Sequence, residues 1–149
     1  MIIENENLRV STPGRICLFG EHQDYLGLPI IAAGISRRVT ITGTRRKDKL
    51  VTIYMPDIDD KDAFEITTEI EYFKPRDYFR SVVNVLQRKG YLFSAGFDIT
   101  IRGDIPINSG TSSSSALIVT WVNFLIQMAD NYEAVSQQLI GESAYEAEV

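Results

Sequence analysis

The sequence has few of the residues that build crosslinks or basic surfaces. It contains one cysteine, Cys17, and one histidine, His22, among 149 residues. No disulfide can form within the chain, and a lone thiol in an apolar run is more typical of a small buried residue than of a nucleophile. Lysine and arginine number 15 against 20 acidic residues, so the formal net charge is -5. Because general nucleic-acid binding requires a basic surface, we expect no nucleic acid as a partner.

Long apolar runs are also missing. The most apolar segment, residues 116–129, is interrupted by Thr120, Asn123 and Gln127, so it is too short and too polar to span a bilayer. The first residues do not combine a basic region with an apolar stretch, as a signal peptide would. We therefore expect a cytoplasmic protein with no membrane partner. A composition of 44% hydrophobic and 23% charged residues is typical of a globular domain, and the length suffices for one core.

The order of the hydrophobic patterns predicts an α+β fold. Short apolar or alternating runs predict strands at residues 15–19, 29–35, 39–42, 50–55, 63–70 and 97–101. Helical spacing predicts helices at residues 75–89 and 114–128, and a third towards the end of the chain. Pro75 suits the first turn of the first helix, and Gly90 can close it. Strands come first and helices later, which favours α+β over an alternating α/β architecture.

The first polar cluster follows a short predicted strand. Pro13-Gly14-Arg15 opens this strand, and Glu21, His22 and Asp24 lie just past its end. Carboxylates and an imidazole accept hydrogen bonds, which suits a ligand with many hydroxyl groups. An arginine supplies fixed positive charge for a phosphate or a developing oxyanion. In the alternative interpretation, Arg15 and Glu21 form a surface ion pair and His22 is an ordinary loop residue; the spacing is not that of a zinc site.

The second polar cluster leads straight into the most apolar helix. It runs from Pro106 to Ala116, with Gly110 followed by four consecutive serines at residues 112–115. Backbone N–H groups and the helix dipole favour an anion at a helix start, and serine hydroxyls can also contact phosphate oxygens or magnesium. No Gly-Lys-Ser/Thr follows, so this is not a Walker A loop. The alternative is a serine-rich helix cap, although a cap needs only one such residue.

Together the two clusters resemble the signatures of the GHMP kinases, a family named for galactokinase, homoserine kinase, mevalonate kinase and phosphomevalonate kinase. Residues 13–25 are similar to the galactokinase signature, and residues 106–116 to the family's phosphate-binding Pro-x-x-x-Gly-x-Ser-Ser-Ser motif. The resemblance implies a GHMP kinase amino-terminal domain over residues 1–149. This domain is of the ribosomal protein S5 domain 2-like type, with a mixed sheet packed with helices. It also implies a second domain that these residues do not contain, so we expect a truncated chain.

The resemblance implies an ATP-dependent, galactokinase-like enzyme that phosphorylates a sugar, at the anomeric carbon. Arg15 would be the catalytic residue, and Glu21, His22 and Asp24 would bind the sugar hydroxyls. Cys17 replaces an asparagine that is common in galactokinases, and residues 28–33 are more similar to mevalonate kinase. A GHMP kinase acting on another small alcohol such as mevalonate is therefore an alternative, although Asp24 favours a sugar. Which sugar it is, and the oligomeric state, stay open.

The resemblance also implies ATP and Mg²⁺ as cofactors. The phosphate-binding residues would be Gly110, Ser112, Ser113 and Ser114. Magnesium would be held by Ser113 and by Glu148, with Glu146 as the second choice. The family's catalytic aspartate would follow this glutamate and fall after Val149, so we expect the 149 residues alone to be inactive. A non-catalytic relative that binds sugar and ATP for regulation is the remaining alternative.

Overall fold

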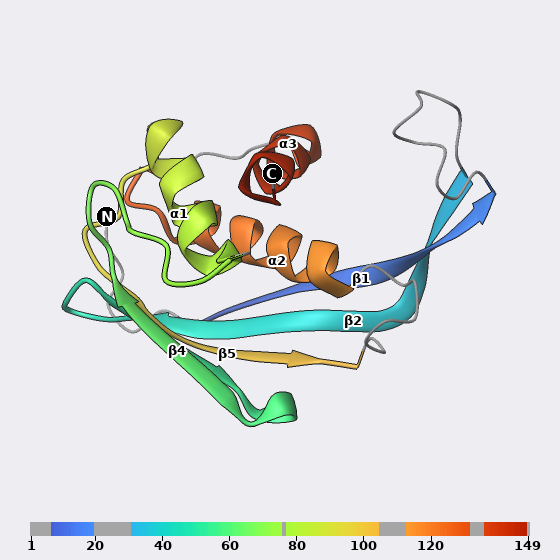
Figure 1. Ribbon diagram of the computed structural model, residues 1–149, viewed down its shortest axis with the longest axis horizontal. Coiled ribbons are helices and arrows are strands. Elements are labelled where there is room, and N and C mark those ends of the chain that lie inside the picture. The colour runs from blue at the N-terminus through green and yellow to red at the C-terminus, as the bar shows by residue number, and fades with distance from the viewer. Residues whose placement is uncertain (1–6, 20–30, 76, 105–112, 132–135, 149) are drawn as a thin grey trace.

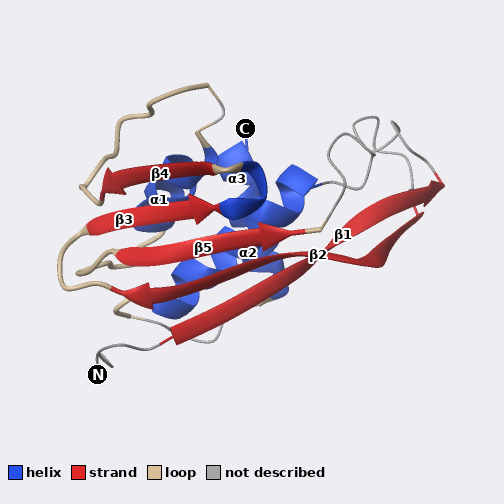
Figure 2. Cartoon of the chain, turned by 90° about the horizontal axis from the view of Figure 1, so that it is seen from below, coloured by secondary structure: helices blue, strands red, loops and turns tan. Residues whose placement is uncertain are grey.

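The computed structural model describes residues 7–19, 31–75, 77–104, 113–131 and 136–148. These residues form a five-stranded sheet that carries its helices on one face (Figure 1). Figure 2 views the sheet from its open side, with the helices behind it. The α+β class predicted from the order of the patterns is confirmed. No helix in the described part of the chain is long and apolar enough to cross a membrane.

The sheet is mixed, and its strands lie in the order β1-β2-β5-β3-β4. Their bounds are Asn7–Phe19 for β1, Ile31–Arg45 for β2, Leu50–Met55 for β3, Asp60–Glu65 for β4 and Phe97–Gly103 for β5. β3 and β5 are parallel, whereas the pairs β1–β2, β2–β5 and β3–β4 are antiparallel. A short 3-10 helix, η2 (Pro56–Ile58), connects β3 to β4.

The first two strands form one long hairpin where the sequence predicts three short strands. β1 begins at Asn7 instead of Arg15, and β2 unites the strands predicted at residues 29–35 and 39–42. Gly34 lies within β2 and opposite Arg15. The register shifts between Pro13 and Arg15, where the single residue Gly14 lies opposite residues 35–37, so the extra residues of this irregularity lie in β2. Pairing with a neighbouring strand thus joins two runs that the local pattern separates.

β4 lies earlier in the chain than its apolar pattern predicts, at residues 60–65 instead of 63–70. It ends at Glu65, yet Ile66 and Ile70 beyond it are buried. Asn84 of α1 (Tyr78–Arg88) takes the place of a neighbouring strand there. Its side-chain amide donates to Ile70 O at 2.8 Å and accepts from the Ile70 N–H at 2.9 Å. Apolar residues buried against a helix produce the same pattern as residues buried in a sheet, so periodicity alone extends the strand too far.

The other helices are α2 (Ser113–Met128) and α3 (Gln137–Glu148). α2 packs on β1 and β2 and also contacts α1 and α3, so it is the central helix of the layer. α1 begins at Tyr78 rather than Pro75, because the Asp77 carboxylate accepts from the Arg80 N–H and caps the helix there. Gly90 follows the end of α1 with φ of 98°, as expected for a closing glycine.

The core lies between the helices and the sheet, and its largest fully buried side chains are Trp121, Phe97 and Phe124. Trp121 stacks on Phe124 with 5.8 Å between ring centroids, and its indole N–H donates to Phe79 O at 3.0 Å. Gly43 of β2 lies directly beneath α2. A Cβ atom there would be 2.8 Å from Phe124 Cζ and 2.6 Å from Ile99 Cγ2. The helix can therefore pack this closely on the sheet only because residue 43 has no side chain.

A buried ion network ties the edge strand β4 to α1. Arg80 is 6% exposed, and its Nη1 lies 2.9 Å from Asp62 Oδ2 and 3.1 Å from Asp77 Oδ2. Burial by itself raises the pKa of Asp62, but the hydrogen bonds from Arg80 and from the Ala63 N–H outweigh it, so this pKa lies below its ordinary value. Removing one member would leave a buried charge with fewer partners, which is costly.

Candidate functional site

Two strands that precede the polar clusters finish at the same end of the sheet. β1 and β5 are both antiparallel to β2, so they run in the same direction. Figure 1 shows both running toward the end of the molecule where α2 begins, with β1 extending well beyond β5. Thr12 and Gly103 both pair with Val39, so β1 and β2 continue past the end of β5. This overhang of the hairpin bends toward the face that carries the helices (Figure 1).

Arg15 lies on the overhang of β1, and its side chain is exposed. Within the described residues it forms no hydrogen bond or ion pair. The predicted sugar-binding residues Glu21, His22 and Asp24 lie outside the described residues. The structure therefore locates the strand that leads to this cluster and leaves its side-chain arrangement a prediction.

The start of α2 has the character of an anion site. The helix begins at Ser113, Ser114 is exposed, and the first turn contains no acidic residue. No carboxylate in that turn offsets the positive end of the helix dipole. Gly110 and Ser112 lie outside the described residues, as does the side chain of Ser113. Their proposed contacts with phosphate stay predictions, while the helix start they flank is confirmed.

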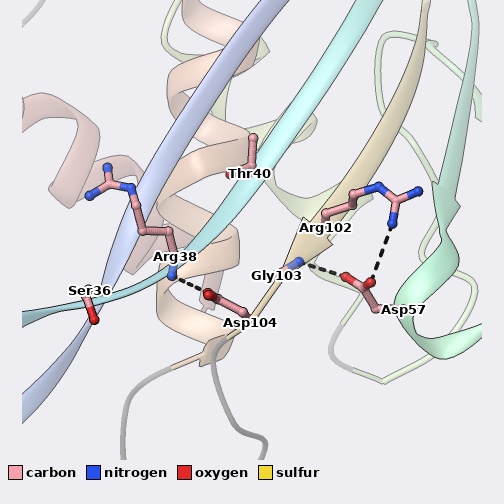
Figure 3. Close-up of a pocket in the computed structure, with 7 residues that line it drawn as sticks. All are labelled: Ser36, Arg38, Thr40, Asp57, Arg102, Gly103 and Asp104. Atoms are coloured by element: carbon pink, nitrogen blue, oxygen red, sulfur yellow. Dashed lines mark hydrogen bonds and ion pairs between the residues drawn. The ribbon is translucent and has the colours of Figure 1, made fainter.

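Two carboxylates hold the last residues of β5 and the residue after it (Figure 3). Asp57 of η2 accepts from the Gly103 N–H at 2.8 Å, and its other oxygen lies 3.8 Å from Arg102 Nη1. Asp104 accepts from the Arg38 N–H at 2.7 Å, and its own N–H donates back to Arg38 O at 3.2 Å. The chain is thus held on both sides immediately before residues 105–112.

These contacts border an open hollow of about 300 Å³ beside the end of β5 (Figure 3). Its lining consists of Ser36, Arg38, Thr40, Asp57, Arg102, Gly103 and Asp104. The hydrogen bond from the Arg38 N–H, together with the charge of Arg37, holds the pKa of Asp104 below its ordinary value. Asp104 is therefore ionised at neutral pH.

Sequence reasoning missed both carboxylates. Asp104 stands between the predicted strand at residues 97–101 and Pro106, so its position at the edge of a motif could have drawn attention to it. Asp57 carries no such signal, because it follows a different strand and is 46 residues from Gly103.

α3 carries both glutamates that the resemblance suggests for magnesium. Glu146 forms an ion pair with Lys89 at the end of α1, at 2.9 Å. The side chain of Glu148 lies outside the described residues. Among the side chains that are described, no group of three or more His, Cys, Asp or Glu residues could hold a metal ion. Both magnesium assignments therefore stay predictions.

Two protein families match the regions that hold the polar clusters. Residues 3–45 match the galactokinase galactose-binding signature, a region that includes β1 and β2. Residues 77–149 match the GHMP kinases N terminal domain, a region that runs from α1 through β5 and α2 to α3.

Galactokinases are similar to most of the chain. The galactokinase of Haemophilus influenzae (strain PittGG) is 34% identical over 125 residues, which are 83% of this chain and 33% of that relative. The galactokinase of Mannheimia succiniciproducens is 33% identical over 126 residues, with the same shares. The chain thus spans about one third of the length of these relatives.

Solved structures share the fold. The mevalonate kinase of Methanococcus jannaschii has a TM-score of 0.83 at 21% identity, with 96% of this chain and 46% of that chain covered. The galactokinase of Lactococcus lactis complexed with galactose has a TM-score of 0.80 at 27% identity, with 96% and 37% covered. The first likeness concerns the fold alone. From the matched regions and the galactokinase relatives together, the chain belongs to the GHMP kinase family and carries its amino-terminal domain.

Proposed function

We propose that the chain provides the sugar-binding and ATP-binding part of a kinase that transfers the γ-phosphoryl group of ATP to the anomeric hydroxyl of a galactose-like sugar. The observation that carries this proposal is the galactose-binding signature over the β1–β2 hairpin, which reaches the end of the molecule where the serine-rich helix α2 begins. A sugar signature beside a helix start suited to phosphate is the combination that a sugar kinase needs.

In this proposal, the sugar is bound by residues that follow β1. Glu21, His22 and Asp24 accept hydrogen bonds from its hydroxyl groups. All three lie within the segment that matches the galactose-binding signature. A site built to pair specific hydroxyls discriminates strongly between sugars, because a wrong epimer leaves polar groups without partners.

The triphosphate is bound at the start of α2 by Gly110, Ser112, Ser113 and Ser114. Backbone N–H groups and the helix dipole supply positive potential there, and the first turn holds no acid that would oppose it. Magnesium, held by Ser113 and Glu148, would neutralise charge on the triphosphate. This arrangement fits the exposed position of Ser114 in the first turn.

The transfer itself requires positioning and charge stabilisation more than covalent chemistry. The sugar hydroxyl oxygen attacks the γ-phosphorus, the bond from that phosphorus to the β–γ bridging oxygen breaks, and ADP leaves. The hydroxyl proton passes to a base that we assign to no residue of this chain. Arg15 stabilises the charge on the phosphoryl group in transfer, a role supported by its exposed guanidinium, which has no partner among the described residues.

Titration calorimetry tests the proposal, on the 149-residue chain and on the longest product of its gene that contains it. We expect galactose to bind more tightly than glucose or mevalonate, and MgATP to bind as well. Asp24→Asn should weaken the binding of galactose and leave the affinity for MgATP unchanged. Asp60 is an exposed carboxylate in β4, so the matched control Asp60→Asn should change neither affinity.

Each contrary outcome has a defined meaning. Absence of both galactose and MgATP binding in both preparations contradicts the proposal. Preference for mevalonate replaces the sugar assignment with another small alcohol. Binding of both ligands by the longer product without ADP formation identifies a sensor rather than an enzyme.

A further inference from the structure

The end of β5 is held by side chains from segments far away in the sequence. Asp57 is 46 residues from Gly103, and Arg38 is 66 residues from Asp104. These contacts come from both sides, since β5 lies between β2 and β3 in the sheet. We call Asp57 and Asp104, with the backbone groups they bind, the β5 clamp.

On the β3 side, the clamp replaces a missing strand. β3 pairs with β5 only as far as Tyr54 and Thr100, and η2 then turns the chain away. The Gly103 N–H has no strand partner there, and the Asp57 carboxylate accepts its hydrogen bond at 2.8 Å. A charged acceptor makes a stronger bond to a backbone N–H than a neutral one does.

On the β2 side, the clamp lengthens the ladder by one residue. The regular pairing ends at Val39 and Gly103. Beyond it, Asp104 and Arg38 exchange two hydrogen bonds, one from each N–H, and the Asp104 side chain is one of the acceptors. The backbone is thus fixed in direction where it leaves the sheet for residues 105–112.

We propose that Asp57 and Asp104 are positioning residues that direct the chain from β5 into the phosphate-binding loop and so place Gly110 and the serines at the start of α2. This inference rests on the proposed function. Two carboxylates near a triphosphate would repel it unless their charge were offset. Arg102 lies 3.8 Å from Asp57, and Arg37 lies 3.6 Å from Asp104, so each carboxylate has a nearby cation.

A purely stabilising role explains the clamp poorly. Both ion pairs are exposed, with side-chain exposures of 66% and 44% for Arg102 and Asp57 and of 60% and 59% for Arg37 and Asp104. Exposed ion pairs contribute little to the free energy of unfolding. The two carboxylates differ from ordinary surface ion pairs because each also accepts a hydrogen bond from a backbone N–H, that of Gly103 or Arg38, directly before residues 105–112.

The test compares alanine and asparagine at both positions in the intact chain. Asp57→Ala and Asp104→Ala remove the acceptor, whereas Asp57→Asn and Asp104→Asn keep an amide oxygen that can still accept. Glu69→Ala is the matched control, because it removes an exposed ion pair to Arg88 of α1, at 2.9 Å. The two measurements are the backbone amide NMR shifts of residues 105–116 and the affinity for MgATP.

We expect the alanine variants to shift the amide resonances of residues 105–112. They should also weaken the binding of MgATP about tenfold, because a loop that has lost one charge-assisted hydrogen bond must be ordered when the ligand binds. The asparagine variants should have amide resonances and MgATP affinities close to those of wild type, and the Glu69→Ala control should have the same values as wild type. Alanine variants that resemble the Glu69→Ala control in both measurements overturn the inference. If wild type binds neither MgATP nor galactose in either preparation, the proposed function is wrong, and the resonances alone decide whether the clamp positions the loop.

Discussion

The face of the sheet beneath the helices and the end of the sheet where β1 and β5 finish are built from different residues. Beneath α2, Trp121 and Phe124 are fully buried and Gly43 allows close packing. At the sheet end, Arg15 and Ser114 are exposed. Buried apolar area stabilises a fold, whereas exposed polar groups contribute little to it. The comparison implies that substitutions in one region change stability and substitutions in the other change ligand binding and turnover.

The largest effect is expected beneath the helices. Trp121→Ala should lower the free energy of unfolding by about 3–5 kcal/mol, because it leaves a cavity beside Phe124 and removes the hydrogen bond from the indole N–H to Phe79 O. Urea unfolding measures the loss. The matched control is Tyr145→Ala in α3, where the ring is 70% exposed and the change should stay within about 0.5 kcal/mol. Equal losses of unfolding free energy in the two variants would contradict the expected difference between buried and exposed positions.

At the sheet end, Arg15→Ala should lower turnover about a hundredfold or more while leaving the unfolding curve unchanged, because the side chain is exposed and without a partner among the described residues. Steady-state kinetics on the longest gene product that contains the chain measure this. Arg15→Lys should recover part of the rate, since it keeps the charge and loses the planar fork. A raised KM with unchanged kcat would mean that Arg15 only binds substrate.

The serines separate ligand binding from helix capping. Where a phosphate contact is lost, the affinity for MgATP should fall about tenfold, with little change in thermal unfolding. The variants are Ser112→Ala, Ser113→Ala and Ser114→Ala. A lost cap would instead cost about 1 kcal/mol of stability. The control is Ser115→Ala, one residue further into α2 and half-buried. If affinity falls only in proportion to stability, the capping interpretation is correct.

The smallest expected effect is the loss of stability at low pH that Asp62 causes. The folded pKa of Asp62 lies below its ordinary value of 3.8, so its contribution to stability is present above that value and lost as the pH falls through the folded pKa. Asp62→Asn should therefore be less stable than wild type at pH 7, and the difference should shrink below about pH 4. Urea unfolding across this range checks it, with exposed Asp60→Asn as control. If the difference in the free energy of unfolding between the two proteins is constant with pH, the charge of Asp62 does not stabilise the fold through Arg80.

Local sequence predicted most elements but set several of their limits wrongly. β3 was predicted with its observed bounds, and α2 begins one residue earlier than expected. The strand predicted at residues 63–70 was too long, because Asn84 of α1 holds Ile70 where no strand is present. The gap predicted between residues 35 and 39 did not end the strand, because β1 pairs with β2 on both sides of it. In each case a distant partner outweighed the local pattern.

What the sequence determined by itself are the features that depend on neighbours along the chain: the α+β class, the glycine that closes α1, and the serine-rich start of a buried helix. The family could be recognised for the same reason, since its two motifs are contiguous runs of residues. Only the tertiary structure decided that β1 and β5 run side by side with β2 toward the same end of the sheet and that Asp57 meets Gly103. Those contacts join residues far apart in the chain, so they exist only after the strands between them have paired.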